Sequence, residues 1–568
     1  MPPTPPTPPT PPTPPTPPTP PPPPAPPPPG CPPPAGSGPD ATTPGELSAP
    51  SPTLRHVTLE WAIGGDADLD GVVTVRHRTG GGEWRAGTPL QRIPAGTVEG
   101  FSWANRHSGS LFGLEPGTTY EIELFLNDPD GGCDLRTLTV STRPVPAPMP
   151  GAPVRSASPA DLEDVLGAAS PGDVIELADG DYAGFSMERD GEPGRPIVIR
   201  SSGGGAVFGS DISLRDRSHV HLVGITLRGG RIRIDDSTGV AIVRSTIETP
   251  MDGIVAYSPA RDAYVADNVI SGPSAWNEPA VGADGDNLGE GIQLTGPGIV
   301  IEHNRVRGFR DCISTMEDDQ ATEQFSVDIL GNDLSECADD GIEADFCFHN
   351  CRIIGNRMTN VFIALSSQPG LGGPTWFIRN VAYNVILSAF KLQRGSVGDV
   401  VLHNTVVKNG DALGIYTSDV FSRQLFRNNL LIGGPGGDYN GYSSGSGRVM
   451  DLGAADPSCD LDYDGLGSTL GTFEGRIGDV RFSSLEEMRA MTTEVHGVQV
   501  DLSVFAASVA YPDNPFPERE VADLRLAPGS AALDVGVVIA GLNDTFRGGA
   551  PDLGAYELGD ALPTYGPR

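Results

Sequence analysis

An asparagine recurs at a nearly fixed interval through the chain, each time directly after a short run of β-forming residues. The positions are Asn304, Asn332, Asn356, Asn380, Asn404 and Asn428, and from Asn332 onward the interval is 24 residues. A sustained period of this length is the signature of a solenoid, in which each repeat stacks on the next. A repeat this short cannot hold a helix pair but fits three strands and three turns. The spacing therefore predicts a β-solenoid.

The recurring asparagines also predict a structural ladder. Rungs of a β-solenoid lie about 4.8 Å apart, so equivalent amide side chains can hydrogen-bond from rung to rung. Asn268 marks an earlier rung, and a Gly/Pro/Asp-rich insertion at residues 271–289 separates it from Asn304. We expect this insertion to form a loop over one face.

The start of the repeat region carries a helix signal. Ser158 and Pro159 suit the cap and the first position of a helix, and acidic residues follow in the first turn. A short amphipathic helix at residues 158–166 would cover the open end of the solenoid, because terminal repeats need a cap.

Composition divides the chain into four parts. Residues 1–45 begin as a Pro-Pro-Thr repeat and continue as nearly pure proline with Gly, Ala and Ser. Such a segment cannot bury a core and acts as a disordered, semi-rigid tether. Residues 46–145 alternate apolar and polar residues, as a small β-sandwich does. The solenoid is expected over 150–557, with a C-terminal tail at 558–568.

The segment from Leu114 to Leu124, with the sequence LEPGTTYEIEL, resembles the fibronectin type III module. The resemblance implies that Tyr120 hydrogen-bonds back to the backbone at a strand corner. It also implies that Trp61 lies in the core. A module of this kind serves as a spacer or adhesion unit and carries no chemistry of its own.

The charge balance excludes several classes of function. The formal net charge is -35, whereas nucleic-acid binding requires a basic face. No apolar run approaches the roughly 20 residues that span a bilayer.

The seven cysteines form no zinc-type pair of CxxC motifs, although Cys347 and Cys351 could bridge locally. No signal peptide is recognisable in the given sequence.

The segment Pro171–Tyr182 and the Asn-punctuated rungs resemble right-handed β-helix polysaccharide lyases of the chondroitinase B and alginate lyase type. They resemble still more closely a broad group of secreted bacterial β-helix proteins, as do residues 340–345 and 550–557. The resemblance implies an all-β, right-handed parallel β-helix and a monomeric, secreted or cell-surface protein. Its partner would be a polysaccharide.

Residues 311–345 hold the densest group of carboxylates. Alternation places Ile342 and Ala344 inward, so Glu343 and Asp345 should face solvent. Glu317 follows Asn304 by 13 residues, as Asp345 follows Asn332, and equal offsets would stack them on adjacent rungs. Carboxylates from neighbouring rungs suit Ca²⁺. Three interpretations stay open: a Ca²⁺ site of Glu317, Glu343 and Asp345, direct carboxylate catalysis, or a solvated acidic face.

Lys391 follows Asn380 by 11 residues, as Glu343 follows Asn332. The two side chains should therefore lie two rungs, or about 10 Å, apart in one column. In the lyases that the chain resembles, a lysine removes the proton α to a uronate carboxylate, an arginine assists, and Ca²⁺ neutralises the carboxylate. The resemblance implies these catalytic roles for Lys391 and Arg394. Ordinary solvated surface is the alternative.

Three further residues are candidates for substrate binding: Asp318, Gln393 and Tyr416. The run from Asp460 to Gly465 matches the start of an EF-hand loop, but Gly471 stands where the final Glu is required. A structural turn is favoured there.

Three hypotheses for function follow. The first is a Ca²⁺-assisted lyase that cleaves a uronic-acid polysaccharide by β-elimination. The second is a glycoside hydrolase that uses two carboxylates from Glu317, Asp318, Glu343 and Asp345. The third is a non-catalytic surface protein that binds glycans along the solenoid. Fold analogy alone does not decide among them.

Overall fold

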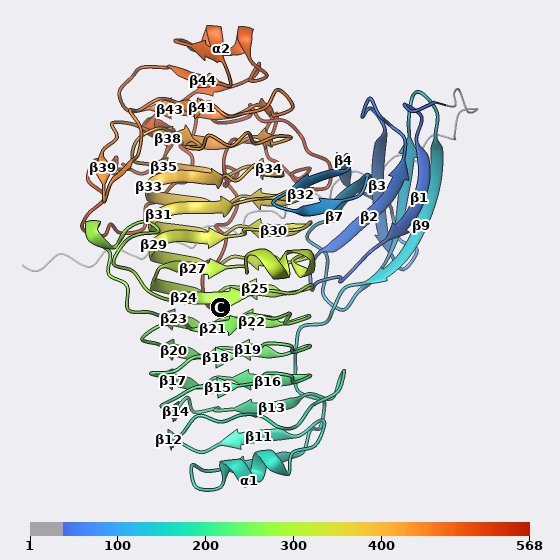
Figure 1. Ribbon diagram of the computed structural model, residues 1–568, viewed down its shortest axis with the longest axis vertical. Coiled ribbons are helices and arrows are strands. Elements are labelled where there is room, and N and C mark those ends of the chain that lie inside the picture. Colours follow the sequence, from blue (N-terminus) through green and yellow to red (C-terminus); the bar gives the residue numbers. More distant parts are fainter. Residues whose placement is uncertain (1–37) are drawn as a thin grey trace, which may run out of the picture.

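The computed structural model describes residues 38–568, apart from the side chains of Asp318 and Asp319. Most of the expected tether at residues 1–45 therefore lies outside the described residues. The fold is a tall right-handed parallel β-helix with an antiparallel module against its side (Figure 1). The predicted fold class is confirmed.

The first wall of the solenoid is a parallel sheet of 13 strands. In order along the solenoid these are β10 (Val154–Ala157), β11 (Val174–Leu177), β13 (Ile197–Arg200), β16 (Val220–Val223), β19 (Ala241–Val243), β22 (Tyr264–Ala266), β25 (Val300–Glu302), β28 (Asp328–Leu330), β30 (Cys351–Ile354), β32 (Leu371–Ile378), β34 (Val397–Leu402), β37 (Leu425–Arg427) and β42 (Asp460–Asp462).

The other walls belong to one sheet of 18 strands. These strands are β12 (Gly180–Tyr182), β14 (Ala206–Phe208), β15 (Ile212–Ser213), β17 (Thr226–Arg228), β18 (Ile232–Arg233), β20 (Thr246–Glu248), β21 (Ile254–Ala256), β23 (Val269–Ser271), β24 (Glu290–Leu294), β26 (Arg305–Phe309), β27 (Asp311–Ser314), β29 (Asp333–Glu343), β31 (Arg357–Ser367), β33 (Val381–Leu392), β35 (Thr405–Lys408), β38 (Leu430–Gly433), β43 (Gly465–Ser468) and β46 (Val498–Gln499). The long strand β29 pairs with both β26 and β27, so it runs through the corner between two walls.

Smaller elements decorate the solenoid. They are the helices α1 (Leu162–Gly167) and α2 (Leu485–Met491), the 3-10 turns η1 (Glu278–Ala280), η2 (Asp318–Glu323) and η3 (Leu502–Val504), the sheet of β36 (Leu413–Gly414), β41 (Met450–Leu452), β44 (Gly475–Ile477) and β45 (Val480–Phe482), and the hairpin of β39 (Asp438–Tyr439) and β40 (Tyr442–Ser443). Helix α1 lies at the expected end and covers the first rungs (Figure 1).

A column of apolar side chains fills the interior beneath the wall that contains β15 to β33. Register pairs Ile212, Ile232, Ile254, Ile292, Ile313, Ile342, Leu365 and Phe390 from rung to rung. All eight are buried. Because side chains alternate along a strand, the residue that follows each member of this column points outward. This outward column is the one that carries the candidate site.

The predicted asparagine ladder is present. Each ladder asparagine donates through Nδ2 to Oδ1 of the next, from Asn268 through Asn304, Asn332, Asn356 and Asn380 to Asn404, at distances of 2.9–3.0 Å. The last predicted member was wrong. Asn404 donates to Asn429 instead of Asn428, and the ladder continues to Asp464. The interval from Asn404 to Asn429 is 25 residues, so this rung is one residue longer than the three before it. The additional residue, Asn428, has φ of 60°, and its side chain is hydrogen-bonded to His403.

Substituting Asn380 tests the ladder. In Asn380→Ala the buried Asn356 loses the acceptor of its backbone N–H and of its Nδ2, and Asn404 loses a donor. Leaving buried polar groups unpaired should lower the free energy of unfolding by about 1–3 kcal/mol. Urea unfolding measures the change. Asn105→Ala is the control, because Asn105 makes one exposed hydrogen bond, to Gly65. Equal effects of the two substitutions would contradict a stabilising ladder.

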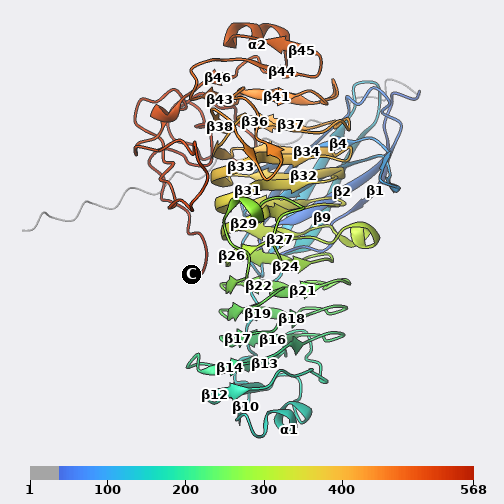
Figure 2. The ribbon, with the colours of Figure 1, turned by 60° about the vertical axis from the view of Figure 1, so that its left-hand side comes forward.

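The chain after β46 runs back down the outside of the solenoid (Figure 2). Its apolar residues, among them Phe505, Leu526 and Leu553, pack on outward side chains such as Leu430. At the end of this path Arg568 forms ion pairs with Asp267 and Glu302. The last strand of the solenoid, β46, ends at Gln499.

The module beside the solenoid is a seven-stranded antiparallel sheet. Its strands are β1 (Thr43–Ser48), β2 (Val57–Gly64), β7 (Arg106–Leu111), β4 (Arg85–Ile93), β3 (Val72–Thr79), β8 (Thr119–Asn127) and β9 (Cys133–Ser141), with a small hairpin of β5 (Gly96–Val98) and β6 (Phe101–Trp103). Trp61 is fully buried, and the Tyr120 hydroxyl accepts a hydrogen bond from the Glu115 N–H at 2.8 Å. Kinship with the fibronectin type III family stays a prediction.

A buried ion pair joins the module to the solenoid. Arg352 on β30 contacts Asp328 on β28 at 2.5 Å, and neither side chain is exposed. From the module, His56 reaches Asp328 at 2.8 Å and the Thr58 hydroxyl accepts a hydrogen bond from Arg352 at 2.9 Å. Burial would raise the pKa of Asp328, but Arg352 and His56 outweigh burial and lower it well below its usual value. The module is therefore docked through charged groups.

Candidate functional site

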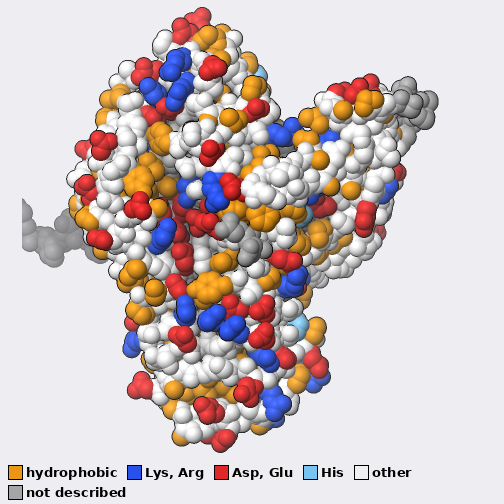
Figure 3. All heavy atoms as spheres, in the orientation of Figure 1, with side chains coloured by type: hydrophobic (Ala, Val, Ile, Leu, Met, Phe, Trp, Pro, Cys, Tyr) orange, Lys and Arg blue, Asp and Glu red, His pale blue; other side chains and the backbone are white. Residues whose placement is uncertain are grey.

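A row of carboxylates crosses successive rungs on the outer face of the wall that contains β21, β24, β27 and β29. Asp252, Glu290, Asp311 and Asp340 occupy these rungs in turn. Glu290 pairs in register with Asp311, and the Asp340 N–H donates to Asp311 Oδ1 at 2.7 Å. Figure 3 shows acidic side chains gathered over β27, β29 and β31. Stacking in a parallel sheet thus brings acids from distant segments together.

Lys391 on β33 reaches down into this row. Its ammonium group forms an ion pair with Asp340, and Nζ lies 3.7 Å from Glu343 Oε1. Glu343 pairs with Ser366, which pairs with Lys391, so the predicted common column of Glu343 and Lys391 is confirmed. The long side chains of Lys391 and Glu343 span the rung of Ser366 that lies between them.

The carboxyl groups have raised pKa values because they are buried together. For Asp311, Asp339 and Glu343, burial raises the pKa most, and the neighbouring carboxylates raise it further. Burial likewise raises the pKa of Glu290 and of Asp345 to about 7. Protons are therefore held in this cluster near neutral pH.

The pKa of Lys391 is raised, whereas a lysine that acts as a base needs a lowered pKa. Burial alone would lower its pKa, but the surrounding acids, Asp340 first, raise it well above the ordinary value. The ammonium form is therefore stabilised. A lysine that removes a proton must first lose its own, so this environment suits a positioning cation better than a base.

The sequence-predicted residues are largely brought together. Carboxylate oxygens of Glu317, Glu343 and Asp345 lie within 4.8 Å of one another. Arg394 lies 3.4 Å from Glu317, and its guanidinium also contacts Glu99 of the module and the ring of Phe346. Lys391 completes the group through Glu343.

Two details differ from the expected geometry. Glu343 pairs with Ser314, ten residues after Asn304, because β29 gains one residue relative to β26 and β27. The equal offsets assumed for Glu317 and Asp345 were therefore wrong by one residue. Asp345 also does not face solvent: it is 1 % exposed, and its carboxylate accepts hydrogen bonds from Ser366 and Gln368.

The three residues predicted to bind substrate do not join the cluster as a set. The Tyr416 hydroxyl lies 2.7 Å from the Ser444 carbonyl oxygen and 3.1 Å from Asp411, which is not a member of the carboxylate cluster. Gln393 donates to the Tyr416 carbonyl oxygen. Asp318 opens η2, and its side chain lies outside the described part of the structure.

Asp311, Asp339 and Asp340 lie in the predicted acidic region at residues 311–345 but were assigned no role, and Glu290 was missed. The separations could not be used, because Glu290 precedes Asp311 by 21 residues and Asp340 follows it by 29. The insertion before Glu290 and the extra residue in β29 destroy the period.

Segments from elsewhere flank the cluster on two sides (Figure 1). On one side the insertion packs through Trp276 against Phe362 and Ile386 of β31 and β33. The expected loop over one face is thus present. On the other side η2 packs through Ala321 against Trp103 of the module. Both flanks leave the acidic face between them.

Several acidic groups offer hard oxygen donors of the kind that Ca²⁺ prefers. Among the described residues these are Glu317 with Glu343 and Asp345, Asp311 with Asp339 and Asp340, and two overlapping groups in the module formed by Asp66, Asp68 and Asp70 and by Asp70, Asp128 and Asp130. The EF-hand-like run does not converge, since Asp460 pairs with Arg427, Asp462 with His496, and Asp464 ends the ladder.

Nothing in residues 38–568 has the length and apolar character of a membrane-crossing helix. No protein-family model, no curated protein and no solved structure matches the chain.

Proposed function

We propose that the protein hydrolyses glycosidic bonds in a polysaccharide that lies over β27, β29 and β31. One observation carries this proposal: buried carboxyl groups with raised pKa values lie against Lys391 and Arg310. Carboxyl groups this close lose their protons in separate steps, so the cluster holds a proton donor and a proton acceptor at the same time. Glycoside hydrolysis needs that pair.

Asp339 and Glu343 are two of the acids whose side chains reach the surface. Their side chains are 8 % and 14 % exposed, whereas Asp340 is fully enclosed. The protonated member of the pair would give its proton to the glycosidic oxygen, and the ionised member would activate water or attack the sugar carbon. Asp340 and Lys391 would act as positioning residues that set the charge of this pair.

The surroundings support a glycan as substrate. The parallel β-helix is a general scaffold of carbohydrate-active enzymes. The candidate acids lie on the outer face of a long flat wall, where an extended polymer can bind along the rungs. Protons retained by Asp311, Asp339 and Glu343 also reduce the local negative charge that would repel an acidic glycan.

A release assay tests the proposal. The full chain is incubated with alginate, pectate, chondroitin, dermatan and neutral plant glycans, and reducing ends are measured together with the ultraviolet absorbance of unsaturated uronates. We expect new reducing ends without that absorbance on at least one polymer. Absorbance that rises with the reducing ends would contradict hydrolysis.

The second candidate is Ca²⁺-assisted β-elimination of a uronic-acid polysaccharide. The observation in its favour is that Glu317, Glu343 and Asp345 converge beside Lys391 and Arg394. The three carboxylates would hold Ca²⁺, which supplies charge neutralisation for a uronate carboxylate. An absorbance rise that EDTA and Lys391→Ala both abolish would establish this reading. Neither product on any polymer would favour a non-catalytic glycan-binding protein.

A further inference from the structure

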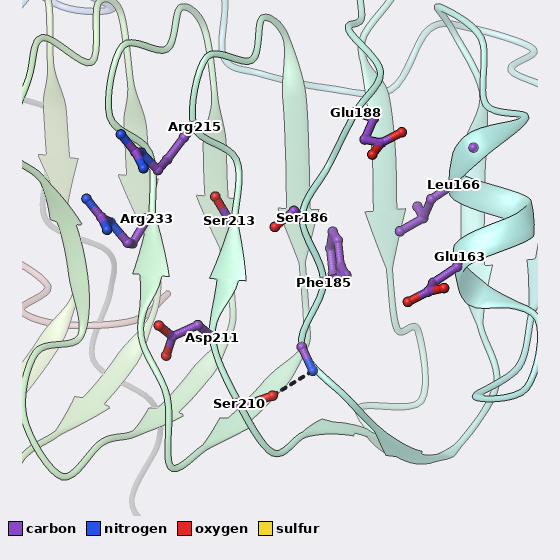
Figure 4. Close-up of a pocket in the computed structure, with 12 residues that line it drawn as sticks. Glu163, Leu166, Phe185, Ser186, Glu188, Ser210, Asp211, Ser213, Arg215 and Arg233 are labelled. Carbon is purple, nitrogen blue, oxygen red and sulfur yellow. Dashed lines mark hydrogen bonds between the residues drawn. The ribbon is translucent and has the colours of Figure 1, made fainter.

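A cavity of about 810 Å³ opens on the first rungs of the solenoid, far from the carboxyl cluster. It lies between α1 and the rungs of β15 and β18. Ser186, Ser213, Arg215 and Arg233 present polar groups to it, and Phe185 lies among them (Figure 4). Within residues 38–568 the hydroxyls of Ser186 and Ser213 make no hydrogen bond to another residue, so they are available to a ligand.

The cavity has two acids toward α1 and two arginines at the other end, where Asp211 also lies. Glu163 and Glu188 lie toward α1, and Arg215 and Arg233 lie side by side at the other end (Figure 4). Both arginines share one carboxylate, that of Asp235, at 3.4 and 3.2 Å. The two guanidinium groups share this one acid, so several of their N–H donors stay available to a ligand, although Asp211 lies at the same end. Such a pair suits a planar carboxylate, which arginine binds with two parallel hydrogen bonds.

The cavity and the carboxyl cluster lie on one outward column. Register pairs Ser186 with Ser213, Ser213 with Arg233, and then Val255, Gln293, Ser314 and Glu343 in succession. Four rung steps separate Arg233 from Glu343, which is about 19 Å at the spacing of β-strands. One rung is close to the length of one sugar unit in an extended glycan. A single chain of about five units therefore reaches from one place to the other.

We propose that this cavity is a remote subsite that binds a carboxylate-bearing sugar unit of the same polysaccharide that reaches the carboxyl cluster. This inference rests on the proposed function and adds the substrate class, a uronate-containing polymer. The arginine pair would hold the sugar carboxylate. Ser186, Ser213 and Glu188 would bind the hydroxyls.

Oligosaccharide binding tests the subsite directly. The probes are tri- and hexasaccharides of galacturonate, of alginate and of chondroitin, with cellohexaose and xylohexaose as neutral counterparts. Calorimetry uses the full chain carrying Asp339→Asn, so that the probes stay intact. A trisaccharide is too short to span both places. We expect at least one acidic hexasaccharide to bind about tenfold or more tightly than its trisaccharide, the size of one hydrogen-bonded charged contact.

Added Arg233→Gln should remove this gain. Arg228→Gln is the matched control, because Arg228 pairs with Glu248 on β17 and β20 and does not line the cavity. An equal gain for neutral hexasaccharides, a gain that survives Arg233→Gln, or no gain at all would each overturn the subsite. If a polymer is hydrolysed but the acidic hexasaccharide binds no more tightly than its trisaccharide, the subsite alone is refuted. If the tighter binding depends on Arg233 but no polymer is hydrolysed, the proposed reaction alone is refuted.

Discussion

Asp339→Asn should reduce kcat for polysaccharide hydrolysis by roughly 10²–10⁴-fold, the usual contribution of a general acid or base. An amide keeps the size of the side chain but neither donates nor accepts the transferred proton. Glu343→Gln should produce a loss of the same order for the same reason. KM should change little in both variants, because the lost interaction belongs to the transition state.

Glu248→Gln provides the matched control. Glu248 is an exposed carboxylate on β20 whose partner is Arg228 at 3.3 Å, so its loss should leave kcat within twofold of the parent, as expected of a surface ion pair. If Glu248→Gln and Glu343→Gln reduced kcat equally, the assignment of the acids would be refuted.

The pH profile offers a separate readout of the same prediction. Lys391 lowers the pKa of Asp311, Asp339 and Glu343, so Lys391→Met should raise those pKa values. Activity that depends on a protonated carboxyl is lost as pH rises through its pKa. The alkaline limb of kcat should therefore move to higher pH in Lys391→Met. A limb that moves to lower pH would contradict the role of Lys391 as a positioning cation.

Arg352→Met should lower the free energy of unfolding by about 3–5 kcal/mol, the usual cost of leaving one charge of a buried pair uncompensated. The substitution removes the main partner of the fully buried Asp328 and also the hydrogen bonds to Thr58 and Ser110 of the module. Denaturant unfolding followed by fluorescence measures the change. Arg228→Met, at an exposed pair, should cost less than about 1 kcal/mol.

The pH dependence of this effect has a definite sign. The folded-state pKa of Asp328 is lowered, so its ion pair contributes stability above the unfolded pKa, near 3.9, and loses it as pH falls toward the folded value. The difference between the parent and Arg352→Met should therefore shrink on acidification below about pH 4. A double variant with Asp328→Asn should recover part of the loss, and a double variant as unstable as the single one would show that the charge is not responsible.

The solenoid could be predicted from the sequence because its cause is periodic. Between Asn304 and Asn429 a ladder asparagine recurs in every rung at intervals of 24–28 residues, and apolar residues fill the interior of each rung. The prediction went wrong where the period changes. Asn428 was predicted because the intervals from Asn332 to Asn404 are 24 residues, and only the stacking of rungs shows that the next one is longer.

The site was predictable only in part, for the same reason. Glu343 and Lys391 share a column and a common offset, so their proximity followed from the spacing. Glu290 and Asp311 share a column but no common offset in the sequence, because an insertion of irregular length precedes Glu290. Burial could not be foreseen either. Alternation shows which face a carboxylate occupies, but segments distant in sequence, such as η2 and the insertion, decide whether water reaches it.

The docked module fixes the number of rungs in the part of the solenoid that it contacts. Its contacts extend from Arg143 on Gly298, through His56 on Asp328, to Arg92 on Arg423. Each rung of a solenoid contacts mainly its neighbours, so a whole repeat can be added or removed without disturbing distant rungs. Between Gly298 and Arg423, deletion of one rung would displace every later contact by about 4.8 Å. Insertions and deletions of repeats should therefore be tolerated among the first rungs and excluded from this stretch, which also holds the candidate site.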